Sequence, residues 1–229
     1  MKLLLIPGSG GPREVWRYQT EYFPGSEGIA LPGHPDGEPC TSVDEYVEWL
    51  RGYIHRQGYR DVVLAGHSLG GAIAQLYGLN YGDELRGLVL IGTGARLRVR
   101  PDILESTRGM IGNDDAWKKY LEEGSTLTDP EMKKALLQAR MRIGPAVLLN
   151  DFLCCDKFDI MDRLQDLKLP TLVICGTEDV MTPVKYATFL ADRIEGSARL
   201  IIDGATHSVA TEKPGEVNQA IESFLNSLS

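Results

Sequence analysis

The sequence lacks any apolar run long enough to cross a bilayer, which requires about 20 residues. Its first apolar run, residues 3–6, ends at Pro7, well short of the roughly 7–15 residues of a signal-peptide core. Cysteine and histidine are scarce: the 4 cysteines have no metal-ligand spacing, and the 4 histidines form no His-Glu-x-x-His pattern. We therefore expect a cytoplasmic protein with reduced thiols, no membrane span and no metal site.

Basic residues are too few to form a surface for nucleic acid or an anionic membrane. The 24 Lys and Arg face 32 Asp and Glu, which gives a formal net charge of −8, and other polyanions repel such a protein at long range. The expected partner is a small molecule, and the sequence leaves the oligomeric state open. With 229 residues, 43% of them hydrophobic, the chain can bury the core of one globular domain that carries an insertion.

Short apolar runs typical of buried strands alternate with amphipathic stretches. The runs fall at residues 2–6, 28–31, 62–65, 88–91, 171–175 and 199–202. Such alternation is typical of β-α-β units, whose right-handed crossovers place helices on both faces of a parallel sheet. The sequence thus predicts an α/β fold with a doubly wound, mostly parallel sheet of about six strands. Ligands bind such sheets at the carboxyl ends of the strands.

The alternation stops between residues 95 and 169, where no strand-like run occurs. Amphipathic helices are predicted there at residues 101–111, 114–123, 129–140 and 145–153, so residues 95–169 are expected to form a helical cap. Residues 1–94 and 170–229 form the predicted core. The cap carries several large apolar side chains, which either fill its own core or line an adaptable substrate pocket: Met110, Met132, Met141 and Phe152.

A Gly66-x-Ser68-x-Gly70 pattern joins the apolar run 62–65 to a stretch of small and apolar residues at helical spacing. This is the strand–turn–helix context of a nucleophile elbow. A serine on so sharp a turn takes a strained backbone conformation, and side chains two positions before and after it would collide. Ser68 is therefore predicted to be a nucleophile exposed at a strand end.

An acid and a histidine follow two later predicted strands. Asp179 comes after the run 171–175 and His207 after the run 199–202. A serine hydroxyl is a weak nucleophile until a base removes its proton, and the base needs an acid to orient it and stabilise its cation. Ser68, Asp179 and His207 therefore predict a catalytic triad for acyl transfer. Thr182 is expected to cap the helix after Asp179, with Pro183 at its first position.

The glycine-rich turn at residues 7–11 has no dinucleotide-binding spacing, because an arginine occupies the third glycine position. No P-loop lysine follows it either, and no cofactor is expected. Such a turn instead lets backbone N–H groups approach a reacting oxygen, as an oxyanion hole requires. Ser9 is predicted to supply one N–H donor, with Gly10 as the alternative, and Leu69 the other. Gly8 and Gly10 are expected to lie beside the substrate.

Three motifs together resemble those of the α/β-hydrolase-fold serine hydrolases, of the capped esterase and lipase-like kind. They are Gly-His-Ser68-Leu-Gly-Gly, Gly176-x-x-Asp179-x-x-x-Pro183 and Gly204-x-x-His207-x-x-x-x-Glu212-x-Pro214, and the resemblance covers nearly the whole chain. It implies the α/β-hydrolase fold, with the family's first two strands absent and a helical cap inserted after the fourth strand. Where the family usually has His-Gly before the oxyanion turn, this chain has Pro7-Gly8.

The activity that the resemblance implies is hydrolysis of carboxylic esters through an acyl-enzyme intermediate. A compact cap with its own core to maintain leaves only a modest pocket, which predicts small to medium acyl groups. The same triad can open lactones or hydrolyse thioesters and C–C bonds, and the sequence does not separate these reactions. A ligand receptor that keeps the fold and turns over slowly is a further alternative.

Other polar residues near the motifs have structural explanations. His67 is expected to pack or hydrogen-bond beneath the turn, and His34 to be structural or to lie at the edge of the cap. Arg96, Arg98 and Arg100 alternate after the run 88–91. We expect them to pair with the acidic surface rather than to bind an anionic substrate.

Overall fold

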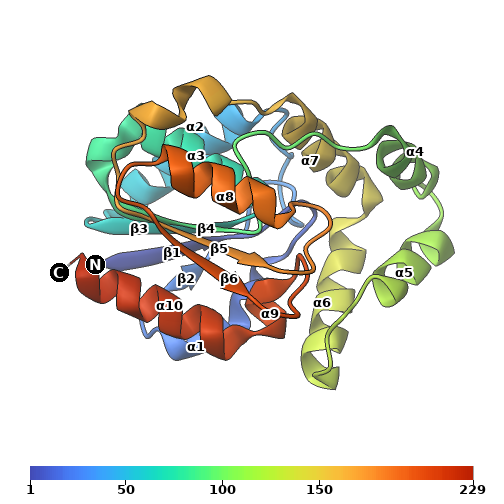
Figure 1. Cartoon of the computed structure of the whole chain (residues 1–229). Coiled ribbons are helices and arrows are strands. Elements are labelled where there is room, and N and C mark those ends of the chain that lie inside the picture. Colours follow the sequence, from blue (N-terminus) through green and yellow to red (C-terminus); the bar gives the residue numbers. More distant parts are fainter. Residues whose placement is uncertain (229) are drawn as a thin grey trace.

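A six-stranded sheet, parallel throughout, forms the centre of the molecule in the computed structural model, which describes residues 1–228 (Figure 1). The strand order is β2-β1-β3-β4-β5-β6. The strands are β1 (Lys2–Ile6), β2 (Glu27–Gly28), β3 (Val62–His67), β4 (Leu85–Ile91), β5 (Thr171–Gly176) and β6 (Ala198–Ile202). The predicted fold class is therefore confirmed.

The second strand is shorter than predicted and begins one residue earlier. Only Glu27 and Gly28 pair with β1, instead of residues 28–31. Ile29 still donates a backbone hydrogen bond to Leu5, but the chain then leaves the sheet. The cause is the dense turn that begins at Pro32, because proline cannot donate to a strand ladder.

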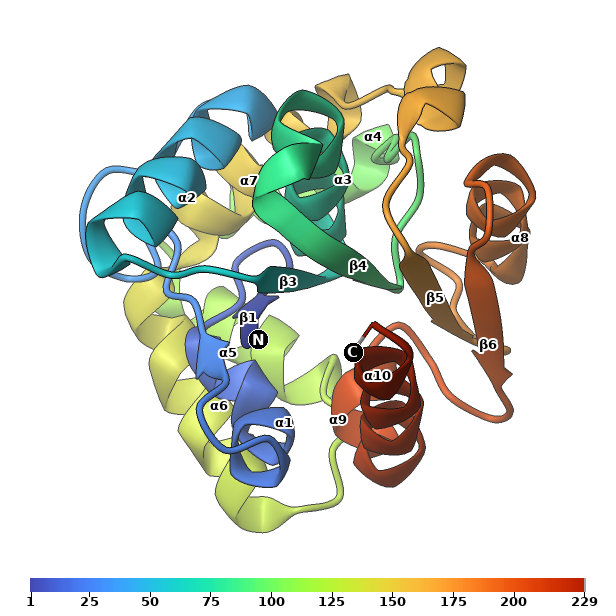
Figure 2. The same ribbon diagram turned by 90° about the vertical axis from the view of Figure 1, so that its left-hand side faces the viewer.

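Helices cover both faces of the sheet (Figure 2). One face packs against α2 (Val43–Gln57), α3 (Leu69–Tyr81) and α8 (Val184–Arg193), and the other against α9 (Val209–Glu212) and α10 (Pro214–Ser227), with α1 (Arg17–Tyr22) beside α10. Successive strand residues point to opposite faces, so Leu4 and Leu64 belong to the first hydrophobic cluster and Leu5 and Val63 to the second. This double covering explains the continuous apolar runs of the strands.

Four α-helices and one 3-10 helix lie between β4 and β5: α4 (Pro101–Gly109), α5 (Asp114–Glu123), α6 (Pro130–Ile143), α7 (Pro145–Lys157) and the 3-10 helix η3 (Met161–Asp166). We call residues 95–169 the cap segment. Figure 1 shows its helices beyond the carboxyl ends of the strands. Asp129 caps α6 by accepting hydrogen bonds from the backbone N–H groups of Glu131 and Met132. Within residues 1–228, no helix has both the length and the apolar character that a bilayer crossing requires.

Candidate functional site

Ser68 lies between β3 and α3 with φ 53° and ψ −115°, a conformation that costs energy in a residue with a side chain. The flanking glycines make this turn possible. A Cβ atom at Gly66 would lie 2.1 Å from the carbonyl oxygen of Gly70, and one at Gly70 would lie 2.3 Å from that of Ile6. The turn is fixed to β4, since the Ser68 N–H donates to Ile91 and Thr93 Oγ1 donates to the Ser68 carbonyl.

Asp179 and His207 meet at the neighbouring strand ends, where His207 Nδ1 lies 2.9 Å from Asp179 Oδ2. The Thr182 hydroxyl donates to the same oxygen at 2.7 Å, and the backbone N–H groups of Met181 and Thr182 donate to Oδ1. Burial raises the pKa of the Asp179 carboxyl, but these hydrogen bonds and His207 outweigh it and hold the pKa below its ordinary value. Asp179 is therefore a buried, ionised carboxylate aligned on His207.

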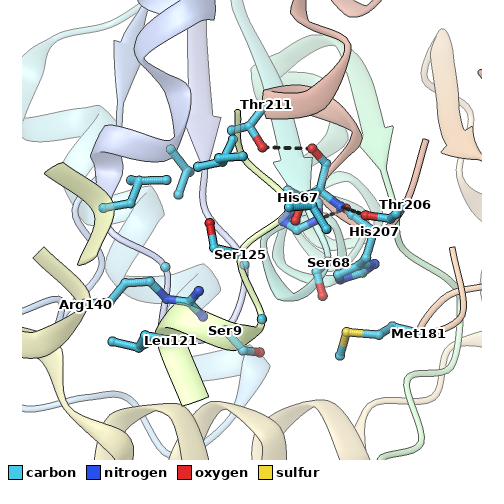
Figure 3. Close-up of a pocket in the computed structure, with 18 of the residues that line it drawn as sticks. Ser9, His67, Ser68, Leu121, Ser125, Arg140, Met181, Thr206, His207 and Thr211 are labelled. Carbon is cyan, nitrogen blue, oxygen red and sulfur yellow. Dashed lines mark hydrogen bonds between the residues drawn. The ribbon is translucent and has the colours of Figure 1, made fainter. Parts of the chain in front are cut away.

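His67 supports the His207 loop through a hydrogen bond to its backbone. Its Nε2–H donates to the backbone carbonyl of His207 at 2.8 Å, and the two rings lie 4.6 Å apart between centroids. Burial, together with the nearby His207, lowers the pKa of His67 to about 3, so His67 is neutral at physiological pH. Figure 3 shows the side chains of Ser68 and His207 next to each other at the pocket wall. The hydrogen bond expected of His67 is therefore present, and the residue also lines the pocket in front of Ser68.

A buried polar cluster anchors the glycine-rich turn after β1. The Gly10 N–H donates to Asp151 Oδ2 at 2.8 Å, and Tyr46 donates to Oδ1 at 2.8 Å. His34 Nε2 lies 3.1 Å from Asp151 Oδ2, while its Nδ1 lies 2.9 Å from the carbonyl oxygen of Gly11. Burial lowers the pKa of His34, but Asp151 outweighs it and raises the pKa above its ordinary value. A protonated His34 can donate to both acceptors.

A pocket of about 390 Å³ opens in front of Ser68 (Figure 3). The core contributes the polar part of its wall, including Gly8, Ser9, His67, Ser68 and His207. The cap segment contributes a mostly apolar part, including Leu121, Leu136, Leu137, Leu148 and Phe152. The volume is that of a typical small-molecule site.

The pocket does not include every residue expected beside a substrate. Phe152 lines it, but Met110 packs in a cluster inside the cap segment, Met132 is fully buried, and Met141 lines a separate hollow next to Arg142. Helical periodicity identifies which side of a helix is buried, but not whether that side faces a ligand pocket or a neighbouring helix. Gly10 is also absent from the pocket wall, because its N–H points to Asp151.

Thr182 does not cap a helix as predicted. The helix α8 begins at Val184, with Pro183 at the cap position, so the Thr182 side chain is free to bind Asp179. Its hydroxyl also lies 3.2 Å from His207 Nδ1. Pro183 is also not the first helical residue that the sequence predicts, because its ψ of 158° keeps it outside the helix.

Sequence reasoning also missed Asp151 and Arg140. A signal for Arg140 was present: with Lys133, Leu136 and Leu137 it falls at the i, i+3, i+4, i+7 spacing of one helix face, and all four line the pocket. For Asp151, the only signal in the sequence was an acidic residue within the largely apolar helix α7. Among residues 1–228, no group of three or more His, Cys, Asp or Glu side chains could hold a metal ion.

Residues 3–220 match a family described as the alpha/beta hydrolase family. The chain belongs to the alpha/beta hydrolase family. Among solved structures of this fold, a thermophilic esterase is 34% identical, with a TM-score of 0.80, over 99% of this chain and 90% of that one. A thermophilic esterase from Thermogutta terrifontis with bound malate is 25% identical, with a TM-score of 0.84, over 100% of this chain and 90% of that one. A putative carbamate hydrolase, RutD, from Azorhizobium caulinodans is 24% identical over 97% of this chain and 90% of its own length.

Proposed function

We propose that this chain is a carboxylic-ester hydrolase that works through an acyl-enzyme intermediate on Ser68. The observation that carries the proposal is the 2.9 Å contact between His207 Nδ1 and Asp179 Oδ2 at the strand ends beside the Ser68 turn. An imidazole held by a buried carboxylate through Nδ1 has its Nε2 available as a general base. The esterase names of two similar solved structures support the same reaction class.

In the proposed reaction, Ser68 Oγ attacks the ester carbonyl while His207 Nε2 takes the hydroxyl proton. The tetrahedral intermediate collapses to the acyl-enzyme, and His207 passes the proton to the departing alcohol. A water molecule, deprotonated by His207, then attacks the acyl group, and His207 returns the proton to Ser68 Oγ as the acid leaves. Asp179 stays ionised throughout and stabilises the imidazolium.

The oxyanion that develops in each step is assigned to the backbone N–H groups of Ser9 and Leu69. Leu69 is the first residue of α3, and the first N–H groups of a helix have no intrahelical acceptor. Between Ser9 and Gly10, the commitment of the Gly10 N–H to Asp151 favours Ser9. The turn after β1 lies close to Ser68, because a Cβ atom added at Gly8 would be 3.1 Å from Ser68 Cβ.

The pocket wall favours acyl groups of small to medium size. Leucine and phenylalanine side chains of the cap segment close the side opposite the strand ends, within a volume of about 390 Å³. Residues 95–169 thus act as a cap that sets the acyl preference, on a core of residues 1–94 and 170–229. Lactones, thioesters and C–C bonds remain alternative substrates of the same residues. A ligand receptor is distinguished by its slow turnover.

The experiment is active-site labelling combined with an ester panel. A fluorophosphonate should modify Ser68 and no other residue, as seen by peptide mass spectrometry. The wild type should hydrolyse p-nitrophenyl esters with an optimum at short or medium acyl length. Ser68→Ala should keep the fold, seen by circular dichroism, and lose nearly all hydrolysis. Wild-type turnover in Ser68→Ala, or labelling at another residue, would refute the assignment.

A further inference from the structure

Arg140 is a charged side chain on the pocket wall, and within residues 1–228 its guanidinium makes no hydrogen bond or ion pair. It lies near the end of α6, and its side chain extends into the pocket toward Ser125, opposite Ser68 and His207 (Figure 3). Its Nε atom is buried and has no hydrogen-bond partner among residues 1–228. Burial lowers the pKa of the guanidinium, but an arginine stays protonated in proteins.

The other arginines near the start of the cap segment do not share this isolation. Arg96 contacts Asp159 at 2.7 Å, Arg98 lies 4.0 Å from the same carboxylate, and Arg100 binds Asp102 at 2.5 Å, as expected from the sequence. Within the described part of this acidic chain, no Asp or Glu lies within ion-pair distance of Arg140. Burying a cation without a counter-charge is costly. Because Arg140 is only partly buried and lines the pocket, a ligand in the pocket can supply the missing anion.

We propose that Arg140 binds a carboxylate carried by the substrate, so that the preferred esters are anionic. This inference rests on the proposed ester hydrolysis. The planar guanidinium offers donors in a fixed fork that matches a carboxylate. The leucine-lined wall beside it accepts the carbon chain between the charge and the ester. The substrate class is therefore esters that have an apolar segment and a remote carboxylate, such as half-esters of dicarboxylic acids.

The position of Arg140 relative to the reacting centre fits this use. Its charge is near enough to His67 to contribute to the lowered pKa of that residue, so it lies within electrostatic reach of the Ser68 turn. Ser125 and Leu121 line the same pocket as Arg140 and Ser68. A substrate that spans the pocket therefore places its ester at Ser68 and its charge at Arg140.

The experiment compares matched charged and neutral esters. The kcat/KM values of monomethyl succinate, glutarate, adipate and suberate are measured against the methyl esters of the uncharged acids of equal chain length. A second arm places the carboxylate on the alcohol, with O-acetyl glycolate and O-acetyl 3-hydroxypropionate against ethyl and propyl acetate. The wild type should prefer at least one charged ester by about 10-fold or more, the size of one hydrogen bond to a charged group. The arm that shows the preference tells which side of the ester faces Arg140.

Arg140→Met should abolish this preference and leave the neutral esters within about 3-fold of wild type. Arg140→Lys should keep part of it, because the charge remains and the fork is lost. Arg142→Met is the matched control, since Arg142 is on the same helix, is exposed and lies outside the Ser68 pocket. This variant should keep the full preference. Melting temperatures of all variants exclude a general loss of folding.

A wild type that hydrolyses neutral esters without any preference for the charged ones overturns the Arg140 proposal alone. The proposal is also overturned if Arg140→Met still prefers the charged esters. It is overturned as well if Arg140→Met loses activity equally on charged and neutral esters. If no ester is hydrolysed, the proposed function fails, and binding still tests Arg140. In that case, calorimetry measures the binding of adipate to Ser68→Ala and to the double variant Ser68→Ala/Arg140→Met. The double variant should bind adipate at least 10-fold more weakly. Equal binding to the two variants overturns the assignment of Arg140.

Discussion

Asp151, in helix α7 of the cap segment, accepts a hydrogen bond of 2.8 Å from the backbone N–H of Gly10, 141 residues away in the turn after β1. The turn that carries Ser9 is thereby held from the cap side by a buried carboxylate. The same carboxylate is within reach of His34 and Tyr46. A cap helix thus positions the backbone that we assign to the oxyanion hole, in addition to closing the pocket.

Asp151→Ala should lower kcat by about 10- to 100-fold with little change in KM, because a displaced Ser9 N–H weakens stabilisation that exists only in the transition state. Asp151→Asn is the milder variant in case the alanine variant does not fold. Tyr46→Phe is the control: it removes one hydrogen bond to Asp151 but keeps the contact with Gly10, and should cost less than about 5-fold. Steady-state kinetics measure all three. An unchanged kcat in a folded Asp151 variant would contradict the positioning role.

Asp179→Asn should lower kcat by about 10⁴-fold and leave KM nearly unchanged, because an amide misorients His207 without touching the substrate. The neighbouring carboxylate of Glu178 is exposed at the pocket edge, and Glu178→Gln should have a small effect. Thr182→Val should fall between the two, since it removes one hydrogen bond to Asp179 and keeps the backbone N–H donor. Equal losses at positions 178 and 179 would show that the acid is misassigned.

Phe152→Ala should move the acyl-length optimum toward longer esters. The ring lines the pocket, and each acyl methylene that enters the freed space is worth about 0.8 kcal/mol, or roughly 4-fold in kcat/KM. Met132→Ala is the control, because Met132 is fully buried and lies outside the pocket wall. It should lower the free energy of unfolding by about 2–5 kcal/mol and leave the optimum in place. A profile from acetate to palmitate that neither change alters would argue against a cap that selects the acyl group.

Glu84 should make the stability of the fold depend on acidic pH. Although burial raises its pKa, hydrogen bonds from Arg51, Tyr77 and His55 outweigh this and lower the pKa from 4.5 to about 2. A carboxyl whose pKa is depressed by folding stabilises the fold above its unfolded value, and this contribution is lost as the pH falls through the folded value. At pH 7, Glu84→Gln should lower the free energy of unfolding by about 1–3 kcal/mol.

Urea unfolding at pH 7 and pH 3 tests this linkage. The difference between the wild type and Glu84→Gln should shrink between pH 4.5 and about 2, the range set by the two pKa values. Esterase activity at pH 7 serves as an internal control and should not change, because Glu84 lies outside the pocket wall. A difference in stability that is the same at both pH values would show that the ionisation of Glu84 is not its source.

The sequence by itself determined the sheet, the Ser68 turn and the strand ends that bear Asp179 and His207. These features follow from local causes. Apolar runs without polar alternation require a strand that is buried on both faces, and β-α-β connections require parallel strands. At positions 66 and 70 only glycine fits, because an added Cβ would collide with backbone atoms. The residues to which we assign the chemistry could be found because parallel strands bring their carboxyl ends to one edge.

Tertiary structure alone decided what each cap residue faces. From the sequence, Met110, Met132 and Phe152 could each fill the core of the cap segment or line a pocket. Only Phe152 lines the pocket, because the packing of one helix against another selects which apolar face meets the cavity. The contact of Asp151 with Gly10 and the isolation of Arg140 depend on the same packing. Contacts between residues more than a hundred positions apart leave no local pattern, and a charge without a partner is defined only once every neighbour is in place.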